Sequence, residues 1–185
     1  MEKTRRQLRY WIMFFMIVLF LSGLTAIPLE SELRFLSRCF PLDTPVGEWI
    51  ERVRLAIVDT NRQYPFLAYG YDWLAFAHFI LAILFIGPYR DPVRNKWVIE
   101  FGMIACLLIV PYALIAGHYR GIPLGWRFID CAFGIIGLIP LFICLLKIQL
   151  IQRFDAITIR QNPLEWGRSE AIGSEPVLNK MTERI

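Results

Sequence analysis

Charged residues are scarce in this sequence, which excludes an ordinary soluble domain. Only 19% of the 185 residues are Asp, Glu, Lys or Arg, whereas 56% are hydrophobic and the mean hydropathy is +0.47. A soluble domain of this length carries more charge and has no apolar runs near twenty residues. Four such runs occur here, so the composition predicts one compact integral membrane protein.

Metal and cofactor motifs are also missing. The four cysteines form no CxxC pair and no even set in one loop, so neither a zinc site nor a disulfide framework is signalled. No GxGxxG, GxxxxGKS/T, HExxH or GxSxG motif is present, which argues against nucleotide folds and the common hydrolase sites. We therefore expect no metal, no cofactor and no nucleic-acid partner.

The four apolar runs predict an all-α fold, a polytopic bundle of four transmembrane helices. They cover about residues 10–28, 69–88, 98–117 and 127–150. At 1.5 Å per residue, each can cross a hydrocarbon core of ~30 Å. Residues 147–161 continue the fourth helix with an apolar stripe flanked by basic residues. Residues 1–161 thus form the transmembrane domain, and 162–185 a flexible cytoplasmic tail.

The first run follows basic residues and therefore also resembles a secretory signal peptide. Cleavage after Ala26 would place Leu24 where a small residue is usual, with Pro28 two residues beyond the cut. We prefer an uncleaved signal-anchor helix and keep cleavage as the alternative.

Basic residues near the helix ends predict the orientation. Four lie in the N-terminal segment, and Arg90, Arg94 and Lys96 lie in the short turn between the second and third runs. Both termini should then lie in the cytoplasm, in a bacterial inner membrane, with the 29–68 loop in the periplasm.

The periplasmic loop is predicted to contain one amphipathic helix. Between Pro45 and Pro65, apolar residues including Trp49, Val53 and Ile57 recur at three- and four-residue spacing. We expect this helix to rest on the membrane or cap the bundle. A gate over a substrate cleft is the alternative.

Ionisable residues within the spans are candidates for function, because charge inside a bilayer is costly. On the periplasmic side, Asp72 and His78 lie near the start of the second helix, and Arg127 and Asp130 near the start of the fourth. We expect these helix starts to converge at one level. The preceding loop adds the two further candidates, His118 and Arg120.

Two interpretations of this group stay open. In the first, Asp72 pairs with Arg127 or Arg120, and Asp130 caps the fourth helix. In the second, the group lines an outward-facing pocket. Arg120, Arg127 and His118 would then contact a phosphate or lipid head group, with Asp72, His78 and Asp130 as candidate catalytic residues.

At the cytoplasmic side, Glu100 is expected to pair with Arg94 or Lys96, and a proton-relay carboxylate is the alternative. A haem between His78 and His118 is disfavoured, because His78 should lie about 9 Å deeper at 1.5 Å per residue. Small residues suggest where a membrane-protein partner could dock, besides the lipid bilayer itself: Ala75 and Ala82 on the second helix, Gly134 and Gly137 on the fourth.

The arrangement of Asp72, His78 and Phe79 in helix two, with Arg127, Asp130 and Gly137 in helix four, resembles the VanZ-like family of small bacterial membrane proteins. That resemblance implies a role at the cell envelope, near peptidoglycan or its lipid carriers. This sequence departs from the family in several ways. Asp72 and His78 are six residues apart rather than four, Trp73 replaces a lysine, and Gly134 replaces an asparagine. Glu100 lies at the opposite end of helix three from the family's glutamate, and the long loop is extra.

Three functional hypotheses follow. The first is a non-enzymatic helper or subunit of an envelope complex. The second is an envelope enzyme or head-group-binding protein that uses the periplasmic Asp, His and Arg side chains. The third is a redox or haem subunit.

Overall fold

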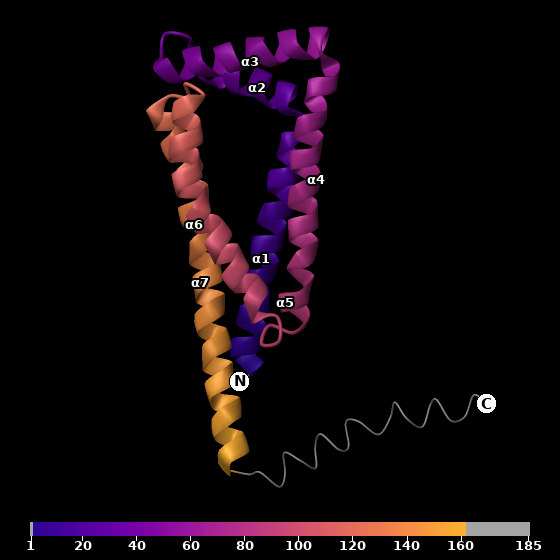
Figure 1. Cartoon of the computed structure of the whole chain (residues 1–185), viewed down its shortest axis with the longest axis vertical. Coiled ribbons are helices and arrows are strands. Elements are labelled where there is room, and N and C mark those ends of the chain that lie inside the picture. The colour runs from indigo at the N-terminus through magenta and orange to yellow at the C-terminus, as the bar shows by residue number, and fades with distance from the viewer. Residues whose placement is uncertain (1, 162–185) are drawn as a thin grey trace, which may run out of the picture.

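The computed structural model describes residues 2–161, and every element in that range is helical (Figure 1). Four of its helices are long and apolar enough to cross a membrane, as the four apolar runs predicted. The elements in chain order are α1 (Glu2–Ala26), α2 (Leu29–Cys39), α3 (Pro45–Gln63), the 3₁₀ helix η1 (Pro65–Ala68), α4 (Tyr69–Leu84), α5 (Ile86–Arg90), α6 (Lys96–Tyr119) and α7 (Leu124–Gln161). The predicted tail, 162–185, lies outside the described residues.

The helices extend beyond the apolar runs. Helix α1 begins at Glu2 rather than near Tyr10, because an established helix propagates easily through good helix formers such as Lys, Arg and Gln. The second predicted helix is divided at Phe85 into α4 and α5. Helix α7 runs on to Gln161, which confirms the predicted continuation beyond Lys147.

The 29–68 loop is more ordered than predicted. A helix is present where one was expected after Pro45, and it is α3: Pro45 occupies its first turn, and the Thr44 hydroxyl accepts a 3.1 Å hydrogen bond from the Gly47 N–H. Helix α2 was not predicted. Leu29, Leu33 and Leu36 show its helical spacing, and α2 packs against α3.

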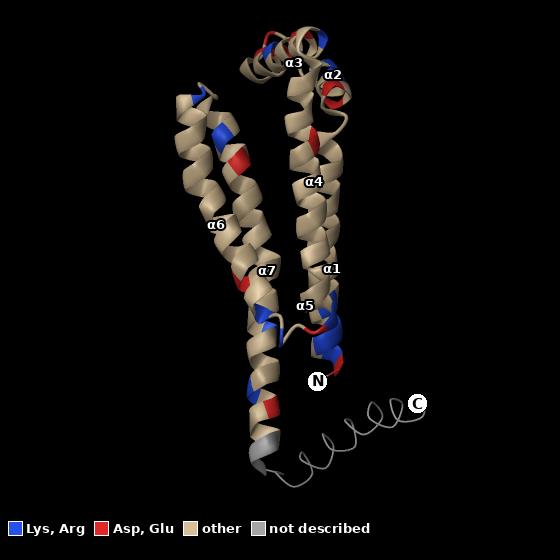
Figure 2. Cartoon of the chain, turned by 45° about the vertical axis from the view of Figure 1, so that its right-hand side comes forward, with Lys and Arg blue, Asp and Glu red and all other residues tan. Residues whose placement is uncertain are grey.

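The long helices form two pairs, α1 with α4 and α6 with α7 (Figure 1). We call the end where α2 and α3 lie the cap end, and the end holding the start of α1 and the α5–α6 turn the base. The pairs meet at the base through contacts of α1 with α7 and of α5 with α6. They diverge toward the cap end in both views (Figures 1 and 2).

The shared core lies in the half of the bundle nearer the base. It combines the first part of α1, the α5–α6 region and the second half of α7, with the buried residues Leu8, Ile12, Phe15, Phe85, Val98, Ile99, Cys106, Leu141, Cys144, Ile148 and Ile151. Helix α4 makes no extensive contact with α6 or α7. The predicted convergence of the second and fourth spans is therefore wrong, since each packs mainly against a different neighbour.

Candidate functional site

The structure distributes the predicted site residues over the two helix pairs. Asp72 and His78 lie on α4, whereas Arg127 and Asp130 lie on α7. Because α4 is not packed on α6 or α7, no single cluster forms. Among the ion pairs of residues 2–161, none joins Asp72 to Arg120 or Arg127, so the predicted pairing is wrong.

Arg127 holds the connection between α6 and α7. Its Nε–H donates a 2.7 Å hydrogen bond to the Ile122 carbonyl oxygen. The chain reverses at Gly121, whose φ of +67° favours glycine. The other candidate anion ligands, His118 and Arg120, are exposed at the same connection. This arrangement stabilises the turn between the two helices.

Asp130 does not cap a helix, because α7 already begins at Leu124 and Asp130 lies inside it. It sits two turns before Gly137, on the same helix face. A Cβ on Gly137 would lie 3.7 Å from Phe15 of α1, so this face packs toward α1 nearer the base. Toward the cap end the pairs separate (Figures 1 and 2), and half-buried Asp130 lies one turn before Gly134, which packs against Cys106 and Ile109 of α6. Asp130 forms no ion pair within residues 2–161.

His78 is half-buried beside α1. Its Nδ1 lies 2.8 Å from the Leu74 carbonyl oxygen. Because a carbonyl only accepts, Nδ1 donates the hydrogen in this bond. Asp72 lies six residues away on a different face of α4, so the two side chains do not form an acid–base pair.

The small-residue faces are already occupied within the chain. Ala75 and Ala82 are buried, and a Cβ on Gly23 of α1 would lie 2.9 Å from the Ala75 oxygen. A Cβ on Gly134 would lie 2.5 Å from the Cys106 oxygen of α6, and one on Gly137 would lie 3.0 Å from Cys106 Sγ. These faces bring the chain's own helices together, and a membrane-protein partner at them stays a prediction.

Asp72 does line a pocket, but with residues that the sequence analysis did not single out. The pocket has a volume of about 260 Å³ and is lined by residues of the α1–α2 connection, α2, α3, η1 and α4. Its polar lining is Glu30, Ser31, Asn61, Tyr71 and Asp72. Asn61 Oδ1 is buried there without a hydrogen-bond partner. The periodicity of α2 is the signal that could have drawn attention to Glu30 and Ser31.

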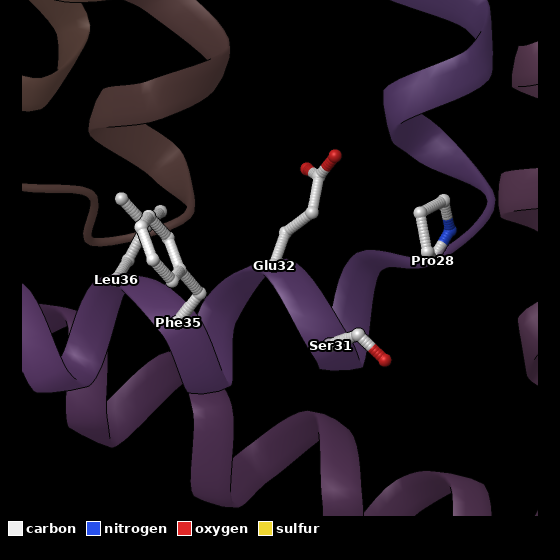
Figure 3. Close-up of a pocket in the computed structure, with 5 residues that line it drawn as sticks. All are labelled: Pro28, Ser31, Glu32, Phe35 and Leu36. Atoms are coloured by element: carbon white, nitrogen blue, oxygen red, sulfur yellow. The ribbon is translucent and has the colours of Figure 1, made fainter.

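A second cavity, of about 410 Å³, lies along α2 and is lined by Pro28, Ser31, Glu32, Phe35 and Leu36. Figure 3 shows Glu32 extending from α2 on the side away from α3, with Pro28, the residue directly before α2, on one flank. The cavity therefore lies on the side of the cap that faces the long helices.

At the base, Glu100 forms the predicted ion pair with Lys96, at 3.0 Å between carboxylate and ammonium. Within residues 2–161 no three His, Cys, Asp or Glu side chains are grouped to hold a metal ion. Near the cap, the described residues offer hydrogen-bond acceptors, among them Asn61 Oδ1 and the Asp72 carboxylate.

Comparison with known proteins adds no family assignment. No protein-family model, curated protein or solved structure matches this chain.

Proposed function

We propose that this chain is a non-enzymatic subunit or helper of a membrane complex in the bacterial inner membrane. In this proposal both termini lie in the cytoplasm and α2 and α3 lie on the periplasmic side. The basic residues Arg90, Arg94 and Lys96 at the base support this orientation. The position of the amphipathic helix α3 across the cap end also suits a membrane surface (Figure 2).

The half-buried Asp130 side chain, which forms no ion pair within residues 2–161, carries the proposal. An ionisable side chain in a membrane span usually faces a helix bundle or water, or pairs with another polar group. Gly134, one turn further along α7, packs against α6, whereas α4 makes no extensive contact with α7 and the two helix pairs diverge toward the cap end (Figures 1 and 2). A transmembrane helix of a partner protein would pack beside Asp130 and supply a cation or hydrogen-bond donor for the carboxylate.

Site-specific photo-crosslinking in cells tests this proposal. Phe133 lies near Asp130 on α7, whereas Phe128 lies on another face of the same helix; both are exposed, at 70% and 57%. A photoreactive residue at position 133 should give a discrete protein adduct, and one at position 128 should give mainly lipid adducts. Asp130→Asn should weaken the adduct at position 133. Equal yields at both positions, or lipid adducts alone, would contradict the proposal.

Head-group binding at the cap is the second candidate, supported by the unpartnered Asn61 Oδ1 in the pocket with Asp72. Both groups accept hydrogen bonds, so they favour a ligand rich in donors, such as a primary ammonium, over a phosphate. Purified protein should then retain phosphatidylethanolamine over phosphatidylcholine, and Asn61→Leu together with Asp72→Asn should remove that preference. An unchanged preference in the double variant would eliminate this candidate. The envelope role implied by the VanZ-like resemblance stays a prediction.

A further inference from the structure

A groove between α1 and α7 at the base has no role in the function proposed above. Its volume is about 530 Å³, and it is lined by Arg6, Gln7, Tyr10, Trp11, Ile143 and Lys147. Four of these residues come from one face of α1, and Ile143 and Lys147 lie one turn apart on α7. The groove thus combines two cations and two aromatic rings on adjacent helices.

The lining of the groove is positively charged. Arg6 and Lys147 contribute two cations, and no carboxylate is among the lining residues. Asp155, an acidic residue of α7 toward its C-terminal end, forms an ion pair with Arg5, at 3.5 Å, outside the groove. Lys147 Nζ donates a 2.8 Å hydrogen bond to Gln7 Oε1. Since an ammonium has three N–H donors, two remain for an anion.

The polarity of the groove changes along the bundle as the polarity of a phospholipid does. Arg6 lies toward the start of α1, and Tyr10 and Trp11 follow about one turn further along the helix. Aromatic rings of this kind favour the membrane interface. From Lys147, one turn of α7 toward the cap end leads to apolar Ile143. The charged end of the groove, where Lys147 bonds to Gln7, is thus followed one turn toward the cap end by aromatic and aliphatic surface, as the head group of a phospholipid is followed by its ester region and acyl chains.

We propose that this groove binds the head group of an anionic phospholipid. Arg6 and Lys147 would contact the phosphodiester, Tyr10 and Trp11 would flank the ester region, and an acyl chain would lie along Ile143. Basic pockets between membrane helices recognise anionic lipids in this way. The inference needs only the groove and its charges, and it is independent of any partner at Asp130.

Native mass spectrometry of the purified full-length protein tests the inference. The probes are phosphatidylglycerol and phosphatidylcholine with the same acyl chains. The wild-type protein should prefer phosphatidylglycerol, and Arg6→Gln with Lys147→Gln should weaken its binding by about 25-fold, or about fivefold for each basic residue. The matched control is Arg9→Gln with Arg94→Gln, which removes two exposed basic residues that do not line the groove. The control should change binding less than about twofold.

Three outcomes would overturn the inference. Equal losses in the two double variants would mean that diffuse surface charge attracts the lipid. No preference of the wild-type protein would mean that the groove does not select an anionic head group. Displacement of phosphatidylglycerol by inorganic phosphate would assign the groove to a free anion instead. If the double variant does not fold, the single variant Arg6→Gln serves, because Arg6 is exposed; full retention of binding in it would then count against the groove.

Discussion

The side chain of Arg127 lies directly over Gly117. A Cβ on Gly117 would lie 2.8 Å from both Cγ and Cδ of Arg127, so only glycine leaves room for the aliphatic part of this arginine. The same arginine bonds to the Ile122 carbonyl, which fixes the path of the chain from α6 into α7. A side chain that the sequence suggested as an anion ligand therefore has a structural role in joining two helices.

Gly117→Ala should destabilise the α6–α7 pair. The added methyl group forces Arg127 to shift, and overpacking of this kind costs about 1–3 kcal/mol. Thermal unfolding of the purified protein measures the change. Gly125→Ala is the matched control, because a Cβ on Gly125 meets nothing within 4 Å. Equal melting temperatures for the two variants would show that the Arg127 side chain moves aside freely.

Asn95→Asp should loosen the turn between α5 and α6. Asn95 Nδ2 donates hydrogen bonds to the Gly87 oxygen, at 3.2 Å, and to the Asp91 oxygen, at 2.9 Å. A carboxylate of similar shape has no donor for either carbonyl, and the loss of such bonds costs about 1–3 kcal/mol. Amide hydrogen exchange in residues 87–95 should speed up, whereas Arg94→Ala, which alters an exposed side chain, should leave it nearly unchanged.

Acidification should destabilise helix α3, because protonation of Glu51 removes its ion pair with Arg54. Two hydrogen bonds from Arg54, one of them 2.7 Å long, lower the pKa of the Glu51 carboxyl below its ordinary value of 4.5. The pair therefore adds stability above pH 4.5, and this contribution is lost as the pH falls through the lowered pKa of the folded state. Amide exchange of α3, corrected for the intrinsic rate, should show this change. The Glu51→Gln variant should lose this pH dependence of α3 exchange, and the control variant Glu48→Gln should keep it. If Glu51→Gln leaves the pH dependence unaltered, Glu51 is not its cause.

Cysteine labelling should report the orientation. Cys39 is exposed at the end of α2, whereas Cys106, Cys131 and Cys144 are buried. If α2 lies in the periplasm, a membrane-impermeant maleimide should label Cys39 in intact spheroplasts. In a Cys39→Ser background, Arg94→Cys at the base should be labelled only after lysis. The reverse pattern would invert the proposed topology.

Several features of this fold could be predicted from short stretches of sequence. The four apolar runs appear as long helices, and the period of Trp49, Val53 and Ile57 indicated α3. The Lys96–Glu100 pair was predictable because residues four apart on a helix are neighbours. Each of these features depends only on the spacing of nearby residues, because the helix geometry places residues three or four apart on the same face.

The candidate site was less predictable, because it depends on which helices are neighbours. Nothing in the sequence indicates that Gly23 lies against Ala75. In the structure this contact packs the small-residue face of α4 against α1. Asp130 likewise shares a face of α7 with Gly134 and Gly137, and only the structure shows that α6 packs against Gly134 and that Phe15 of α1 lies near Gly137. Asn61 lies in a pocket built from four helices, a grouping that no spacing along the chain encodes.

The amino-acid sequence alone determined that the chain forms apolar helices, since hydrophobicity and helical period are properties of consecutive residues. Only the tertiary structure decided that α4 pairs with α1 and α7 with α6, leaving Asp72 and Asp130 on separate helix pairs. The physical reason lies in the helix surfaces. Every lipid-compatible helix is apolar on most sides, so close fits such as Gly134 against the Cys106 carbonyl, rather than hydrophobicity, select the neighbours.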